Sequence, residues 1–145
     1  MTDRTDDDRP ARPPGSQWPV IAVIAAGGAL GALARHGLQV ALPAGPADFP
    51  WATFLVNVSG CLLIGVLMAL ITRRTHRLVR PFFGVGVLGG YTTFSTYAVE
   101  FQRVAGAGAP LTGLAYVAGT MAAALAAVAA GMWLTRRVAA KVVAP

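Results

Sequence analysis

The sequence predicts an all-α membrane protein with four transmembrane helices, the third of them broken. The 145 residues are 55% hydrophobic and only 12% charged, with a mean hydropathy of +0.59. This composition excludes an ordinary soluble domain. The net charge of +6 does not indicate nucleic-acid binding, because the basic residues flank apolar runs instead of forming a face of their own.

An N-terminal tail, residues 1–17, mixes aspartate, arginine and proline, and we expect it to be disordered and to remain on the mature protein. Four apolar runs make up the predicted transmembrane domain, residues 18–137, and each is long enough to cross a bilayer. The runs are Trp18 to about Leu42, Trp51–Thr72, Pro81 to about Phe101, and about Leu111 to Thr135. A short cytoplasmic tail, residues 138–145, is expected to follow.

The third run has an unusually polar centre with two adjacent glycines, Gly89 and Gly90. Adjacent glycines weaken a helix, and the β-branched threonines after them do little to repair it. We therefore expect the helix to break at Gly89–Thr93. Irregular backbone at membrane depth needs a cover of protein or a water-filled cavity, and its freed carbonyls can coordinate a cation. The Gly27–Gly31 GxxxG predicts closely packed helices.

Positive residues are distributed unevenly between the two predicted sides of the membrane. One side carries ten: Arg4, Arg9, Arg12, Arg73, Arg74, Arg77, Arg80, Arg136, Arg137 and Lys141. The other side has Arg103, with Arg35 near the end of the first run. The positive-inside rule then predicts that both termini are cytoplasmic.

Several polar and aromatic side chains inside the runs are candidates for a pore. Asn57 offers an amide in the second run, with Thr53 one turn earlier on the same face. Phe94 and Tyr97 lie three residues apart, so a helix would bring their rings together, and a ring edge can meet an anion. On spacing alone, Asn57 could instead join two helices, and the aromatic pair could be core packing.

These residues occur in three motifs that together resemble the CrcB/Fluc family of fluoride channels. The motifs are GGALGALARHGL at Gly27–Leu38, FLVNVSG at Phe54–Gly60, and GGYTTFSTYAVE at Gly89–Glu100. The resemblance implies a four-helix protein of the bacterial plasma membrane that assembles as an antiparallel dimer. It also implies passive export of fluoride through two narrow pores.

The resemblance implies roles for particular residues. The expected fluoride-pore residues are Asn57, Phe94, Tyr97, Thr53, Ser95, Thr96, Tyr116, Thr120 and Arg35. The backbone carbonyls of Gly89 and Thr92 match positions that hold a structural sodium ion on the dimer axis, so sodium is the expected cofactor. Tyr97 stands where phenylalanine is commonest in the family, and Ala124 stands where many members have serine.

Other functions find less support in the sequence. An enzyme is not expected, because the chain has no carboxylate pair, no Cys/His cluster and no phosphate-binding loop. A small proton-coupled four-helix drug exporter would need a carboxylate in mid-membrane, and a non-conducting regulatory subunit is a third possibility. Glu100 is expected to pair with Arg103, and Cys61 to be a small buried hydrophobe. The charge bias favours a heterodimer with an oppositely inserted homologous chain over a dual-topology homodimer.

Overall fold

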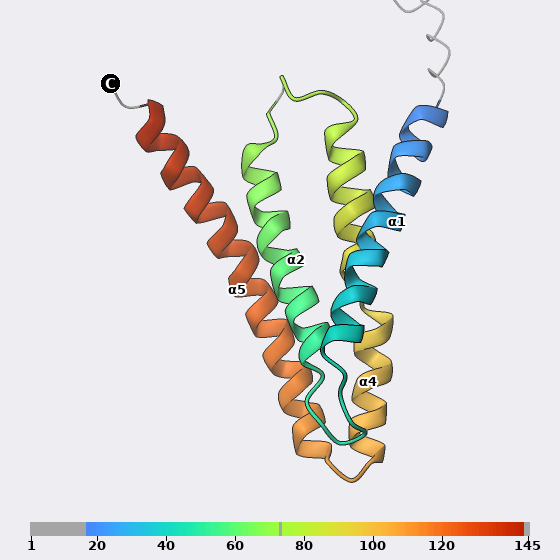
Figure 1. The fold of residues 1–145 in the computed structure, drawn as a ribbon. Helices are drawn as coiled ribbons and strands as arrows, with labels where there is room; N and C mark the ends of the chain where they lie inside the picture. Colours follow the sequence, from blue (N-terminus) through green and yellow to red (C-terminus); the bar gives the residue numbers. More distant parts are fainter. Residues whose placement is uncertain (1–16, 73, 144–145) are drawn as a thin grey trace, which may run out of the picture.

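The computed structural model describes residues 17–72 and 74–143, and its regular structure within these ranges is helical (Figure 1). The elements in order are α1 (Trp18–Ala41), α2 (Trp51–Leu70), η2 (Arg80–Leu88), α3 (Gly89–Tyr91), α4 (Ser95–Gly106) and α5 (Pro110–Val143). The expected disordered tail lies outside the described residues except for Gln17. The all-helical expectation is confirmed.

Among the residues that the structure describes, three helices are long and apolar enough to cross a membrane: α1, α2 and α5. The elements η2, α3 and α4 follow one another through the bundle from one end to the other (Figure 1). The starts and ends of α1 and α2 agree with the predicted runs to within two residues. Helix α5 does not end near Arg137 but continues to Val143, so it includes most of the expected C-terminal tail.

Glycines let the helices approach one another closely, as the sequence predicted. A Cβ atom built on Gly27 would lie 2.5 Å from the carbonyl oxygen of Phe82, and one built on Gly31 would collide with that of Val87. The same close approach joins α2 to α5, where Gly65 and Gly131 leave room for the facing backbone. Since lipid supplies no hydrophobic drive between helices, such contacts are a main source of membrane helix association.

The helix interruption lies slightly later than predicted. Gly89 and Gly90 are both helical, and the chain becomes extended at Thr92, where φ is −72° and ψ is 157°. Regular helix resumes at Ser95. Gly90 packs directly on the Gly28 carbonyl of α1, so this glycine permits helix contact and does not break the helix. We call residues 92–94 the interruption.

The segment before the interruption is wound as a π-helix over η2, which the sequence did not predict. Single π-helical turns are rare and often lie near functional sites. Here η2 packs beside α1 through Gly86, whose added Cβ would lie 2.9 Å from the Ile24 carbonyl oxygen. The wider winding therefore occurs where the backbones of two helices are in contact.

Candidate functional site

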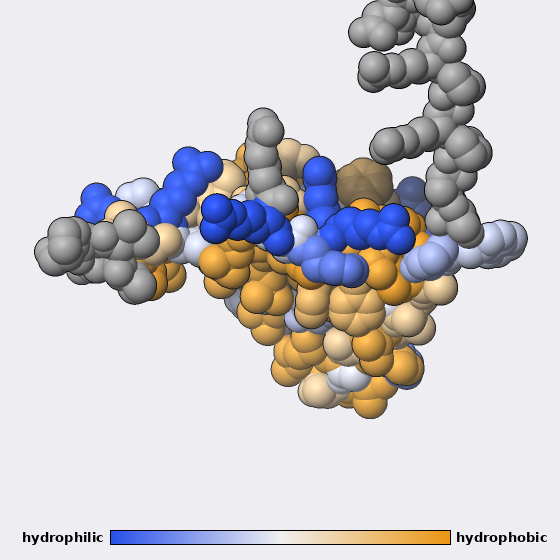
Figure 2. All heavy atoms as spheres, turned by 90° about the horizontal axis from the view of Figure 1, so that it is seen from above, coloured by the Kyte–Doolittle hydropathy of each residue, from blue (hydrophilic) through white to orange (hydrophobic). Residues whose placement is uncertain are grey.

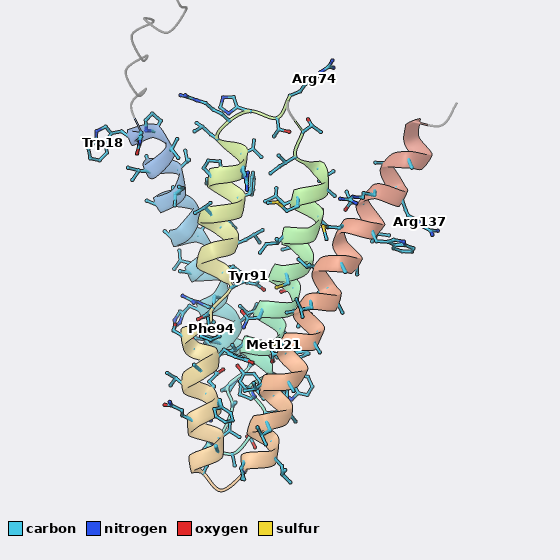
Figure 3. All side chains as sticks on the ribbon, turned by 180° about the vertical axis from the view of Figure 1, so that it is seen from behind. Trp18, Arg74, Tyr91, Phe94, Met121 and Arg137 are labelled. Carbon is cyan, nitrogen blue, oxygen red and sulfur yellow. The ribbon has the colours of Figure 1, made fainter. Side chains whose placement is uncertain are left out.

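A cavity of about 420 Å³ lies beside the interruption, between α2, the α3–α4 segment and α5. Its lining residues are Asn57, Cys61, Gly89, Thr92, Thr93, Phe94, Tyr97, Thr120, Met121 and Ala124. Figure 3 shows Phe94 and Met121 near one another at this level of the bundle. The structure thus brings together four of the predicted pore residues and both residues of the predicted sodium site.

Asn57 holds the interruption through two reciprocal hydrogen bonds to Thr93. Its Nδ2 atom donates to the Thr93 carbonyl oxygen at 3.0 Å, and the Thr93 backbone N–H donates to its Oδ1 atom at 2.9 Å. The primary amide therefore substitutes for a second peptide group, satisfying a donor and an acceptor that the interruption removes from the helix. The Nδ2 atom has a second hydrogen, and Asn57 lines the cavity.

Side chains also accept hydrogen bonds from two backbone N–H groups. In a continuous helix, these N–H groups would donate to the carbonyls of the predicted cation site. In a continuous helix, the carbonyl of Gly89 would accept from Thr93 N–H, and that of Thr92 would accept from Thr96 N–H. Thr93 N–H instead bonds to Asn57, and Thr96 N–H bonds to the Thr93 hydroxyl at 3.2 Å. Both carbonyl oxygens are thereby freed from the helix. Carbonyl oxygens are hard donors, which suit a cation such as sodium.

The aromatic pair differs sharply in exposure. The side chain of Phe94 is 76% exposed, whereas that of Tyr97 is only 8% exposed. Their ring centroids lie 5.7 Å apart in a tilted arrangement. The Tyr97 hydroxyl donates to the Val117 carbonyl oxygen of α5 at 2.8 Å, so it anchors the ring to the bundle.

Two buried hydroxyl groups make no hydrogen bond among the described residues: those of Thr53 and Thr120. Thr120 is 3% exposed and lines the cavity. A buried hydroxyl is ordinarily satisfied, and an exception needs an explanation such as an ion or a water molecule that binds there. The Thr120 hydroxyl can therefore donate to a species that enters the cavity.

Tyr116 is fully buried, and its hydroxyl donates to Glu100 Oε2 at 2.9 Å. Arg103 donates through Nη1 to the carbonyl oxygens of Ala44 and Gly45 in the α1–α2 connection. No ion pair joins Glu100 to Arg103 within the described ranges, so the expected pair is wrong. Each side chain instead reaches a different element: Glu100 holds α4 to α5, and Arg103 holds α4 to the connection.

Five of the nine predicted pore residues do not line the cavity: Thr53 and Tyr116, which are buried, and Arg35, Ser95 and Thr96. Arg35 is half-buried on α1. The Ser95 hydroxyl lies 3.4 Å from that of Thr93, and the Thr96 hydroxyl accepts from the Thr93 hydroxyl at 3.1 Å. Both belong to the hydroxyl cluster at the start of α4, where the Thr93 hydroxyl accepts from the Thr96 N–H.

Sequence reasoning missed three residues around the interruption. The hydroxyl groups of Ser59 and Tyr91 lie 3.0 Å apart, which joins α3 to α2 just before the interruption. Thr93 was not singled out, although it contacts both Asn57 and the start of α4. The only local signal for Ser59 is that it is polar and follows Asn57 by two positions. Nothing in the nearby sequence connects it to Tyr91, which lies 32 residues away.

Comparison with known proteins agrees with this architecture. Residues 22–132 match the family described as "CrcB-like protein, Camphor Resistance (CrcB)". The fluoride-specific ion channel FluC 1 of Streptomyces coelicolor is 52% identical over 143 residues, covering 94% of this chain and 93% of the relative.

Two further relatives have the same kind of name. The fluoride-specific ion channel FluC 2 of Nocardia farcinica is 51% identical over 88% of this chain and 92% of its own length. The fluoride-specific ion channel FluC of Paracoccus denitrificans is 41% identical over 78% of this chain and 91% of its own. The chain is therefore a multi-pass membrane protein that belongs to the CrcB family.

Proposed function

We propose that this chain is a subunit of a fluoride-specific ion channel that lets fluoride leave the cytoplasm passively. The names of the three relatives support this function. The observation that carries it is the cavity beside the interruption, which combines a buried unpaired hydroxyl with an amide and two aromatic rings. None of these groups is a nucleophile–base pair, so the site supports binding and passage instead of catalysis.

Fluoride is small and strongly hydrated, so a pore must replace its water with hydrogen-bond donors. The Thr120 hydroxyl and the second Nδ2 hydrogen of Asn57 are such donors. The rings of Phe94 and Tyr97 would add positive ring edges. The remaining predicted pore residues would extend the path away from the cavity: Thr53, Ser95, Thr96, Tyr116 and Arg35.

We propose that the chain spans the membrane four times and works as an antiparallel dimer. The exposed ring of Phe94 supports a dimer, because an aromatic pore residue on the surface of one subunit needs a second surface to complete a pore. The two freed carbonyls of each subunit, Gly89 and Thr92, would then bind a structural sodium ion on the dimer axis. The positive charge of that ion would favour anions nearby.

The charge bias supports cytoplasmic termini in the bacterial plasma membrane and a heterodimer with an oppositely inserted homologue. Exposed arginines gather where α2, η2 and α5 reach one end of the bundle, namely Arg74, Arg77, Arg80, Arg136 and Arg137. Cysteine labelling at each terminus tests this, after the native Cys61 is replaced. Labelling of both termini from both sides of the membrane would support a dual-topology homodimer instead.

The physiological need follows from acid–base chemistry. Hydrogen fluoride enters cells uncharged, dissociates in the more alkaline cytoplasm and is trapped as the anion, which a passive channel can release. A proton-coupled exporter is disfavoured because Glu100, the carboxylate within α4, lies beyond the interruption and is bonded to Tyr116.

The deciding experiment is fluoride efflux from liposomes that contain only the purified chain, measured with a fluoride electrode. We expect fluoride efflux that far exceeds chloride efflux and that requires sodium. Efflux of chloride at a similar rate would contradict the proposal. Silence would favour an obligate partner, and silence after co-reconstitution with an oppositely inserted homologue would refute the channel function.

A further inference from the structure

One end of the described bundle is strongly cationic. Figure 2, which looks onto this end, shows a band of hydrophilic side chains across it with hydrophobic residues beside the band. The two acidic residues of ranges 17–72 and 74–143 are Asp48, in the α1–α2 connection, and Glu100, on α4. Both elements lie toward the opposite end (Figure 1). Among the described residues, the arginines at the cationic end therefore have no carboxylate neighbour there; they are Arg74, Arg77, Arg80, Arg136 and Arg137.

The C-terminal half of α5 extends beyond the helix packing at this end. Its 34 residues correspond to about 50 Å at 1.5 Å per residue, whereas a bilayer core is about 30 Å thick. Figures 1 and 3 both show this end of α5 leaning away from α2. The last glycine contact between the two helices is at Gly131, just before the arginines.

A groove of about 580 Å³ runs along this end of α5. Its lining residues are Ala129, Met132, Trp133, Arg136, Arg137 and Ala140. At 3.6 residues per turn, these residues lie mainly on the side of α5 opposite Tyr116 and Thr120. The groove therefore faces away from the candidate pore, and Arg137 points away from the other helices in Figure 3.

The groove is divided chemically along its length. Ala129 and Met132 form an apolar section, and the two guanidinium groups form a cationic section that begins a turn further along the helix. The Arg137 guanidinium lies 4.4 Å from the centre of the Trp133 ring, an arrangement that orients the cation. Tryptophan also favours the depth of lipid headgroups. A ligand that fits has an anionic head and an apolar chain.

We propose that this groove binds an anionic phospholipid, with its phosphate on Arg136 and Arg137 and an acyl chain along Ala129 and Met132. The chain is a membrane protein, so lipid is the ligand at hand. Basic residues at a membrane surface favour anionic lipid by about fivefold each.

The test uses Trp133 as the reporter, in a full-length chain carrying Trp18→Phe and Trp51→Phe. These two changes leave Trp133 as the single tryptophan of the three in the sequence. The chain is reconstituted in phosphatidylcholine vesicles with increasing brominated phosphatidylglycerol, and quenching is compared with that by brominated phosphatidylcholine. We expect about 25-fold preference for phosphatidylglycerol, from about fivefold for each of the two arginines. Equal quenching by the two lipids overturns the proposal.

Matched variants separate a groove from diffuse charge. Arg136→Gln/Arg137→Gln should remove most of the preference, whereas Arg74→Gln/Arg77→Gln changes the same charge and should retain it. Equal losses in the two variants overturn the site. Arg136→Lys/Arg137→Lys keeps both positive charges and should keep more than half of the preference. That result would exclude misfolding as the cause of the loss in the glutamine variant. A loss equal to that of the glutamine variant contradicts a phosphate site.

Two competitors complete the test. Soluble glycerol phosphate should not relieve the quenching, because it lacks the acyl chain, and full relief would contradict a lipid site. Removal of residues 1–16, which contain four aspartates, should change the preference less than twofold. A preference that arises only after this removal would mean that the tail, and not lipid, binds the groove in the full-length chain, and it would overturn the proposal.

Discussion

Replacing Asn57 by leucine should destabilise the interruption locally while leaving the rest of the bundle folded. The substitution removes both hydrogen bonds to Thr93, which are worth about 1 kcal/mol each. It also leaves the Thr93 N–H, on a residue that is only 8% exposed, without a partner. An unsatisfied buried donor costs about 1–3 kcal/mol. The sum is about 3–5 kcal/mol for the local structure.

Amide hydrogen exchange measures this quantity directly, because exchange of a protected amide reports its local opening. A loss of about 3 kcal/mol should speed the exchange of the Thr93 amide by about 100-fold. We also expect fluoride efflux to need a higher sodium concentration, since the Gly89 and Thr92 carbonyls are less firmly positioned once Asn57 no longer holds the interruption. Exchange at Thr93 within threefold of the unmodified chain would refute the reasoning.

Two control variants make the test specific. Ser59→Ala removes a neighbouring polar group that contacts Tyr91 and should accelerate Thr93 exchange by less than tenfold. Asn57→Asp keeps an oxygen acceptor for Thr93 N–H, so the amide should stay largely protected. Its negative charge would still oppose fluoride entry. Protection of the amide combined with weak efflux would therefore separate the two roles of Asn57.

Three further variants test the packing and the cavity. Gly31→Ala should lower the stability of the purified protein by about 1–3 kcal/mol in denaturant unfolding, because the added methyl group meets facing backbone. Gly37 has open space around it, so Gly37→Ala should leave the stability unchanged. Equal effects of the two variants would contradict the packing argument. Tyr97→Phe removes the bond to the Val117 carbonyl and should cost about 1 kcal/mol in the same measurement, without slowing fluoride efflux by more than threefold; a larger decrease would assign the hydroxyl to the pore. Thr120→Val removes a buried hydroxyl that has no partner among the described residues, so it should leave stability unchanged or raised yet slow fluoride efflux at least tenfold; unchanged efflux would remove this hydroxyl from the fluoride path.

The limits of the helices were predictable because they depend on local features. Apolar runs are interrupted by prolines and arginines, and these residues act on the chain within a turn or two of their own position. The glycine contacts followed from the same local pattern, since Gly27 and Gly31 share one helix face. What the sequence could not give was the partner of each face, such as Phe82 and Val87 for these two glycines.

The ionic side chains show where short-range reasoning fails. Glu100 and Arg103 are three residues apart, a spacing that favours a pair on one helix. In the structure each side chain finds a partner from another element, 16 residues away for Glu100 and 58–59 residues away for Arg103. Tertiary hydrogen bonds from a buried tyrosine and to carbonyls of the α1–α2 connection outweigh a pair on one helix, whose own contribution is about 0.2–0.5 kcal/mol.

The position of the interruption has the same origin, because it depends on α2 and not on the third apolar run alone. The glycines of that run can accept a helix, and they do so against α1. The helix stops only where Asn57, 36 residues earlier in the chain, takes the Thr93 N–H. One turn along α2, Gly60 leaves the space that the Thr92 side chain fills. The interruption, the freed carbonyls and one wall of the cavity therefore all depend on a single face of α2.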